Sequence, residues 1–409
     1  MNHKKYDGYT SFSYLKAGRD YPVFRLAKAV RRVPEYPLEL TPEQHRTADR
    51  LLTAYPIISL RDHGFITPSN RQRMLEYCRQ PHTFFHYEGI AQAGMDAIFE
   101  NFMDGIAVLT SKAGLKWDDV IFNLGIRLCD IAKQHTVCIA SSVSDILAAK
   151  QEGRVALIPS LEAAGILENE VDRVDVLYGL GIRCMGITYN EANTLGSGLA
   201  EATDGGLTMF GRRVVRRMNQ LGMVIDISHC GDKTSMDVLA CSEQPVLLTH
   251  AGARALWHTP RMKPDHVLQA CAEQGGVIGI CAAPNTTRTR YHADHSMEAV
   301  MAHMEYIIDL VGVDHVGLGP DTFYGDHVAL QQTFDEALSL SASHSGERFE
   351  ESAYVAGLEN PTEAVRNMVR WMVKQGYKEE DIRKIAGGNV LRVLEAIWSG
   401  ETRRKDVKV

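Results

Sequence analysis

Four residues of the kinds that bind divalent metal ions each follow a short apolar run of the sequence. Glu162, His229, His250 and Asp321 stand at or just after the ends of runs rich in Val, Ile and Leu. Carboxylate and imidazole groups are the usual ligands of zinc and of harder divalent ions. A single such residue often only caps the next helix, but four in corresponding positions predict a metal site.

The apolar runs are the elements that must bring these four residues together. Continuous apolar runs are typical of parallel strands that are covered on both faces. Eight runs are candidate strands, at residues 55–60, 106–109, 155–159, 182–188, 223–227, 245–248, 277–280 and 316–318. A further run at 136–140 is either an extra strand or part of a connection.

Amphipathic helical patterns lie between these runs, at residues 207–221, 232–241, 265–274 and 297–311. Repeated alternation of strand and helix predicts a parallel sheet, and eight strands predict a closed (β/α)8 TIM barrel in the α/β class. A doubly wound open sheet is the alternative, but no Gly-rich nucleotide-binding motif follows the early strands. In a barrel, the four candidate ligands converge on the C-terminal face, where barrel enzymes place their chemistry.

Composition limits the class of protein and its partners. The 409 residues are 45% hydrophobic and 23% charged, with a net charge of -7, as in soluble globular proteins. We expect no nucleic-acid partner, because the sequence has no basic patch apart from the end of the chain. We also expect no membrane partner, because no apolar stretch is long enough to span a bilayer and the N-terminus has no signal-peptide pattern. The eight cysteines lack CxxC spacing, which favours reduced, mostly buried thiols and a cytoplasmic location.

Three regions are predicted along the chain. Residues 1–54 form a helical N-terminal extension packed on the barrel, residues 55–398 form the barrel, and residues 399–409 form a C-terminal tail.

Several motifs resemble the membrane (renal) dipeptidase family of the metal-dependent amidohydrolase superfamily, peptidase family M19. The longest is segment 205–229, which begins Gly-Gly-Leu-Thr and ends Asp-Ile-Ser-His. Segments 248–254, 315–321, 357–361 and 387–392 also match family signatures, in the same order. The resemblance extends from about residue 55 to residue 398.

The resemblance implies a barrel that holds two zinc ions and hydrolyses a small-molecule substrate. Glu162 matches the carboxylate that bridges both metals, and His229 and His250 match ligands of the second metal. Asp321 matches the aspartate that contacts the first metal and handles the proton of the bridging hydroxide. Arg261 matches the arginine that holds the substrate carboxylate. The family also suggests a homodimer.

Two positions depart from the family pattern. The first strand should end in His-x-Asp or His-x-His, whose two side chains point the same way. Here Arg61 precedes His63 by two residues and Phe65 follows it by two, so either register loses one ligand. We favour the register in which Arg61 replaces the first ligand and His63 is the second, because the apolar run stops at Leu60. Arginine cannot deprotonate, so it cannot ligate a metal. Tyr189 stands where the dipeptidases carry a histidine that polarises the scissile carbonyl, and it could donate a hydrogen bond instead.

Three functions are compatible with these residues. The first is metal-dependent hydrolysis of a dipeptide or other small amide by a zinc-activated hydroxide, with one or two zinc ions per chain and with Asp321 and Tyr189 as catalytic residues. The second is a degenerate relative, in which Arg61 forms a salt bridge to Glu162 or Asp321, that binds a small molecule or catalyses a non-peptidase step in a biosynthetic pathway. The third is a lactonase or deaminase, because the barrel hosts many reactions.

Overall fold

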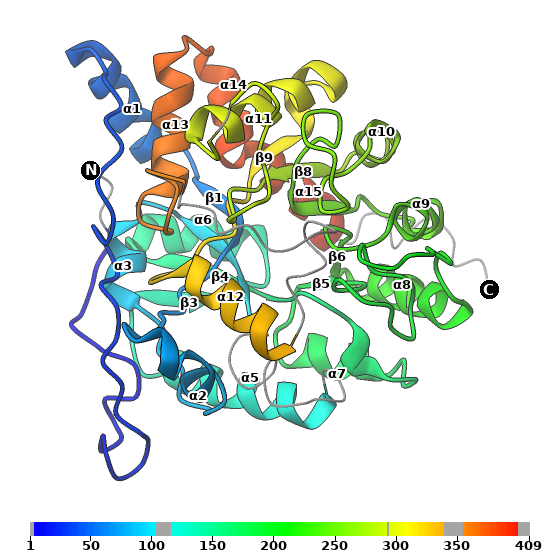
Figure 1. Ribbon diagram of the computed structural model, residues 1–409, viewed down its shortest axis with the longest axis horizontal. Helices are drawn as coiled ribbons and strands as arrows, with labels where there is room; N and C mark the ends of the chain where they lie inside the picture. Colours follow the sequence, from blue (N-terminus) through cyan, green and yellow to red (C-terminus); the bar gives the residue numbers. More distant parts are fainter. Residues whose placement is uncertain (1–3, 103–115, 293, 339–354, 400–409) are drawn as a thin grey trace.

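The computed structural model describes residues 4–102, 116–292, 294–338 and 355–399, and these form a closed barrel of parallel strands with helices around it (Figure 1). Neighbouring strands pair in the order β2-β1-β9-β8-β7-β6-β5-β4, and pairing between β2 and β4 closes the ring. The predicted (β/α)8 barrel is therefore confirmed. The barrel strands are β1 (Ile58–Asp62), β2 (Ala97–Asn101), β4 (Val155–Leu161), β5 (Cys184–Gly186), β6 (Val224–Asp226), β7 (Leu247–Ala251), β8 (Val277–Ile280) and β9 (Val316–Leu318).

Two strands, β3 (Val137–Ile139) and β2, bear on the runs predicted at 136–140 and 106–109. β3 pairs only with the first three residues of β4, whose last two residues pair with β5, so the run at 136–140 is an extra strand that is not part of the ring. The second barrel strand is β2, which lies before the predicted run at 106–109. That run falls outside the described residues. The prediction missed β2 because its two last residues, Glu100 and Asn101, are polar, although both are buried in the folded chain.

The helices follow the strands as the alternation predicts, and all four predicted helical segments are helical. α8 (Met209–Leu221) shows why: Thr208 caps its first turn by accepting a hydrogen bond from the Gly211 amide, and Gly222 ends it at a positive φ of 76°. The other α-helices are α1 (Pro42–Ala54), α2 (Met74–Cys78), α3 (Tyr87–Gln92), α5 (Trp117–Ile131), α6 (Val143–Glu152), α7 (Arg173–Gly179), α9 (Asp232–Cys241), α10 (Asp265–Glu273), α11 (Met297–Val311), α12 (His327–Leu338), α13 (Ala364–Lys374), α14 (Glu379–Arg383) and α15 (Asn389–Trp398). Short helical turns occur at η1 (Arg71–Arg73), η2 (Gly165–Leu167), η3 (Val313–His315) and η4 (Lys384–Gly388).

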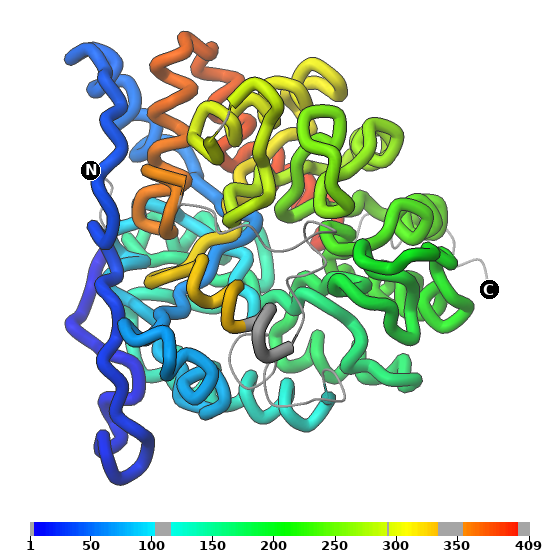
Figure 2. Tube along the Cα trace, viewed as in Figure 1, coloured from blue at the N-terminus to red at the C-terminus, as the bar shows by residue number. Residues whose placement is uncertain are grey.

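The N-terminal extension lies along one side of the barrel (Figure 2). Its helix is α1, and residues 4–41 before it consist of turns, isolated bridges and extended chain. Buried ion pairs hold the start of this segment: Asp96, just before β2, pairs with both Lys4 and Lys150. Asp130 of α5 accepts hydrogen bonds from the Tyr9 hydroxyl at 2.7 Å and the Phe12 amide at 2.7 Å. The extension is thus packed on the barrel through side chains distant in sequence.

The C-terminal helix α15 packs against the side chains that fill the barrel interior. Val390, Val393, Leu394 and Ile397 of this helix share one buried apolar cluster with inward side chains of the strands, among them Leu60 of β1. The interior is therefore a packed core. The polar site lies above it, at the carboxyl ends of the strands.

Among the described residues, none of the helices is both long enough and apolar enough to cross a bilayer.

Candidate active site

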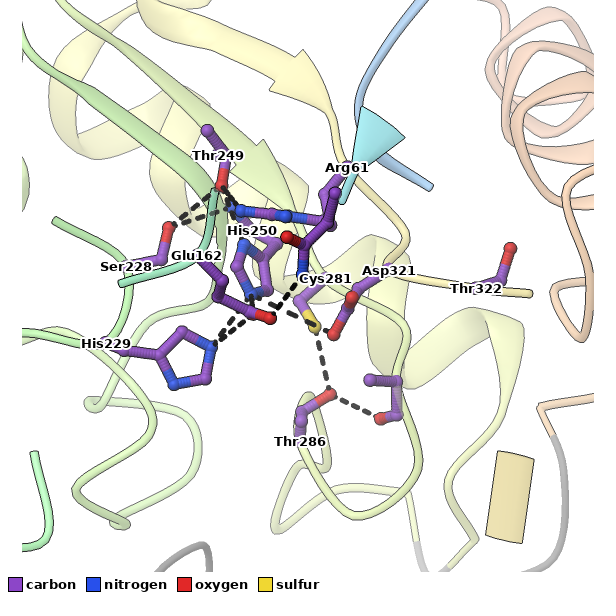
Figure 3. Close-up of polar contacts among 12 residues, drawn as sticks. Arg61, Glu162, Ser228, His229, Thr249, His250, Cys281, Thr286, Asp321 and Thr322 are labelled. Carbon is purple, nitrogen blue, oxygen red and sulfur yellow. Dashed lines mark hydrogen bonds and ion pairs between the residues drawn. The ribbon is translucent and has the colours of Figure 1, made fainter. Parts of the chain in front are cut away.

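Three predicted ligands converge at the carboxyl ends of β4, β6 and β7 (Figure 3). Glu162 directly follows β4, His229 lies three residues after the end of β6, and His250 is in β7. His229 Nε2 lies 3.0 Å from His250 Nε2, and Glu162 Oε1 lies 3.1 Å and 3.3 Å from these two nitrogens. All three side chains are largely buried, so their polar atoms face one another in a space shielded from water.

The partners of the two imidazoles fix which nitrogen faces this space. His229 Nδ1 lies 2.8 Å from Asn190 Oδ1, an oxygen that can only accept, so Nδ1 donates. The Thr249 hydroxyl donates to Asp226 at 2.6 Å, so its oxygen accepts from His250 Nδ1 at 2.7 Å. In their neutral forms, both rings therefore present the lone pair of Nε2 to Glu162. Histidines that bind metals are held by their other nitrogen in this way.

These three atoms fit a zinc ion. Two lone pairs and a carboxylate oxygen that meet at about 3 Å would repel one another without a shared cation. In a tetrahedral zinc site with bonds of about 2.0–2.1 Å, neighbouring ligand atoms are about 3.4 Å apart. Burial and the charge of Arg261 lower the pKa of His229 to about 3, which keeps the ring neutral and able to ligate. Within the described residues, Glu162, His229 and His250 are the one cluster of three ligand side chains close enough to hold an ion.

Asp321 lies beside this cluster, after β9, as predicted. Its Oδ2 is 3.9 Å from His250 Nε2, and its Oδ1 is 3.4 Å from His63 Nε2. Its φ of 62° is unusual for a residue other than glycine. The Asp321 amide donates to the Arg61 carbonyl at 2.8 Å, which ties β9 to β1 in this conformation. Burial alone would raise the pKa of Asp321, but the imidazoles of His250 and His63 lower it below its ordinary value.

Arg61 and His63 both reach the site from the end of β1. Pairing between β1 and β2 shifts by one residue between Ser59 and Asp62, so Arg61 enters the barrel although Leu60 before it is also inside. The Arg61 side chain is fully buried, and its Nη2 lies 3.3 Å from Asp226 Oδ2. The hypothesis of a salt bridge to Glu162 or Asp321 was therefore wrong about the partner, because the ion pair goes to Asp226, deeper in the barrel.

The two predicted substrate-binding side chains adjoin the same cluster. The Tyr189 ring stacks on His229, with ring centroids 4.5 Å apart and planes 16° apart. Burial, together with the charges of Glu162 and Asp321, raises the pKa of Tyr189 well above its ordinary value, so the phenol keeps its proton. Arg261 is buried in the loop after β7, and neither its Nη1 nor its Nη2 has a hydrogen-bond partner among the described residues.

Four polar residues of the site were not identified from the sequence. Asn190 and Thr249 orient the two imidazoles, Asp226 anchors both Thr249 and Arg61, and Asn101 Nδ2 donates to Glu162 Oε2 at 2.8 Å. Asn101 and Asp226 are the last residues of β2 and β6, Thr249 is in β7, and Asn190 follows the end of β5 by four residues. A polar residue in or just after a predicted strand is the one signal that could have indicated them.

The comparison with family models decides the family. Residues 125–336 and 346–406 match the model described as membrane dipeptidase (peptidase family M19). The chain belongs to this family. The match covers about two thirds of the chain and includes Glu162, His229, His250, Arg261 and Asp321, but not the first barrel strand with Arg61.

Similar proteins include two that are named dipeptidases. Dipeptidase tcpJ of Claviceps purpurea is 30% identical over 261 residues, which are 63% of this chain and 55% of that protein. Dipeptidase verJ of Clonostachys rogersoniana is 27% identical over 301 residues, which are 72% of this chain and 68% of that protein.

Two solved structures share the fold. An amidohydrolase from Pseudomonas aeruginosa aligns with a TM-score of 0.70 at 24% identity, covering 86% of this chain and 99% of that one. A metallo peptidase from Rhodobacter sphaeroides, liganded with a phosphinate mimic of the dipeptide L-Ala-D-Ala, aligns with a TM-score of 0.65 at 20% identity, covering 84% and 99%.

Proposed function

We propose that this member of the family is a metal-dependent hydrolase of dipeptides or of similar small amides that carry a free carboxylate. The observation that carries the proposal is the convergence of Glu162 Oε1, His229 Nε2 and His250 Nε2 on one buried point. Arg261 is a buried cation whose Nη1 and Nη2 have no hydrogen-bond partner in the described part of the chain, and it lies close enough for its charge to lower the pKa of His229.

Glu162, His229 and His250 would hold the metal, which we propose to be zinc because two imidazoles and a carboxylate are a common zinc ligand set. When bound, zinc supplies Lewis acidity, polarising a carbonyl and lowering the pKa of a coordinated water to about 7.

Three further side chains would act on the substrate. Arg261 binds the substrate carboxylate through the paired nitrogens of its guanidinium. Asp321, ionised at neutral pH, takes a proton from the attacking water and returns it to the departing amine as the C–N bond breaks. Tyr189, which keeps its proton, donates a hydrogen bond to the negative charge that develops on the carbonyl oxygen.

The relatives support the substrate class. Two curated relatives are named dipeptidases, and a solved relative binds a mimic of L-Ala-D-Ala. We therefore extend a dipeptide substrate to this chain as a proposal. A cytoplasmic location and a homodimer remain predictions of the sequence.

The test is an assay of zinc-loaded protein against a panel of L,L- and L,D-dipeptides, with release of free amino acid as the readout. Glu162→Gln should abolish turnover, because it removes the anionic ligand while keeping the shape of the side chain. Glu273→Gln, on the exposed face of α10, is the matched control and should retain full activity. Turnover that survives Glu162→Gln would contradict the proposal.

A second candidate function is a non-peptidase step or small-molecule binding by a degenerate site. Arg61 favours this second function, because its permanent positive charge stands at a position where the family pattern has a metal ligand. The same panel separates the two functions. A folded, zinc-loaded protein that releases no amino acid from any dipeptide would favour the second candidate.

A further inference from the structure

We propose that the site takes a single metal ion, because the guanidinium of Arg61 supplies the second positive charge that its carboxylates require. This inference rests on the proposed metal-dependent function and specifies its cofactor: one divalent ion bound by Glu162, His229 and His250, with Arg61 and Asn101 closing the space beside it.

Arg61 brings a permanent, buried positive charge to the site. The guanidinium cannot lose its proton, and its side chain is fully buried at the centre of the barrel mouth. Besides its pair with Asp226, it acts electrostatically on Glu162 and Asp321, the two carboxylates nearest the histidines. The carboxylates therefore already share one permanent cation.

The two oxygens of Glu162 have different partners. Oε1 faces the two histidine nitrogens, whereas Oε2 accepts a hydrogen bond from Asn101 Nδ2 at 2.8 Å. Asn101 is 3% exposed at the end of β2, so its amide is held there by the fold. This hydrogen bond uses one lone pair of Oε2, so a second ion at that oxygen would have to share it with the Asn101 amide.

His63 and Asp321 are the side chains that remain as ligands for a second ion. His63 Nε2 and Asp321 Oδ1 lie 3.4 Å apart, and Arg61 is near enough to interact electrostatically with both residues. The pair offers two ligand atoms where a zinc site normally has at least three protein ligands. Any ion between them would lie close to the Arg61 charge, which repels it. The residues on this side of Glu162 therefore do not fit a second metal.

Metal content tests the inference directly and needs no knowledge of the substrate. We expect about one zinc per chain by elemental analysis after loading and desalting, and Co²⁺ absorption that saturates at one equivalent. Arg61→His restores the His-x-His pattern with His63 and should raise the capacity towards two. Arg61→Lys keeps the charge and should remain at one. Arg216→His, on the exposed face of α8, is the matched control and should also remain at one.

The outcomes separate this inference from the proposed function. Two zinc ions in the wild-type protein would overturn the inference and leave the hydrolase proposal standing. No zinc in the wild-type protein would overturn both. If circular dichroism shows that Arg61→His is folded but the variant still binds one ion, Arg61 does not set the number of ions bound per chain, and the inference is wrong. If Arg61→His does not fold, Arg61→Lys decides, because a capacity of two in that variant would equally contradict the role of the charge.

Discussion

Replacing Arg261 with methionine should change catalysis and stability in opposite directions. The Arg261 side chain is 1% exposed, and both terminal nitrogens lack a hydrogen-bond partner among the described residues. An unpaired buried charge costs free energy in the folded state. Methionine fills a similar volume without that charge, so we expect the free energy of unfolding to stay the same or to rise.

Catalysis should fall because the substrate carboxylate loses its partner. Removing one member of a buried, hydrogen-bonded charge pair costs about 2–5 kcal/mol. At about 1.4 kcal/mol per factor of ten, kcat/KM should drop by about 30-fold to several thousand-fold.

Two substrates make the assay specific to this contact. Wild-type protein should strongly prefer a dipeptide over the same dipeptide with its C-terminal carboxylate converted to an amide. Arg261→Met should lose most of that preference, whereas Arg216→Met, on the exposed face of α8, should keep it. If Arg261→Met still prefers the free carboxylate, or if it is destabilised by several kcal/mol, our account of this side chain is wrong.

Three further predictions concern the surroundings of the site. Asn190→Ala should weaken zinc binding by about 10- to 100-fold in a chelator competition, because His229 loses the oxygen that orients it at 2.8 Å. Gly186→Ala should lower the free energy of unfolding by about 3 kcal/mol or more in urea, because the new Cβ would lie 2.0 Å from the Glu162 carbonyl oxygen. Burial lowers the pKa of Lys263 from 10.5 to about 8, so its charge destabilises the fold below pH 8. That penalty, about 3 kcal/mol, should disappear as the pH rises from about 8 to 10.5, and Lys263→Met should remove this part of the pH dependence.

Matched variants control these predictions. Asn190→Asp keeps an acceptor oxygen for His229 and should retain most of the zinc affinity. Gly125→Ala adds the same methyl group on the exposed face of α5, where nothing lies within 4 Å, and should stabilise the protein by up to about 1 kcal/mol. A loss of stability in Gly125→Ala equal to that in Gly186→Ala would contradict the steric argument. If the free energy of unfolding of Lys263→Met rises above pH 8 as steeply as that of the wild-type protein, the pKa assigned to Lys263 is wrong.

The sequence predicted the elements that local patterns specify. Seven of the eight predicted runs fall on strands of the barrel, because a strand buried on both faces needs a continuous apolar run. The candidate ligands were found because four residues of ligand type follow corresponding apolar runs, which helix capping alone would not explain.

Features that depend on contacts between distant segments could not be predicted. The extended course of residues 4–41 rests on partners such as Asp96 and Asp130, far away in the sequence. The roles of Asn101 and Asn190 follow from atoms on other strands, and an asparagine alone carries no such signal. The ion pair of Arg61 with Asp226 depends on a one-residue shift in strand pairing, which no pattern in β1 reveals.

The position of α15 has a consequence for how the chain is completed during synthesis. Leu60, in the first barrel strand, packs in the same buried cluster as Val393 and Ile397 of the last helix. More than 300 residues are made between them, so the floor of the barrel stays open to water until α15 has left the ribosome. A nascent chain stalled before α15 would therefore expose the apolar side chains that this helix covers in the folded protein.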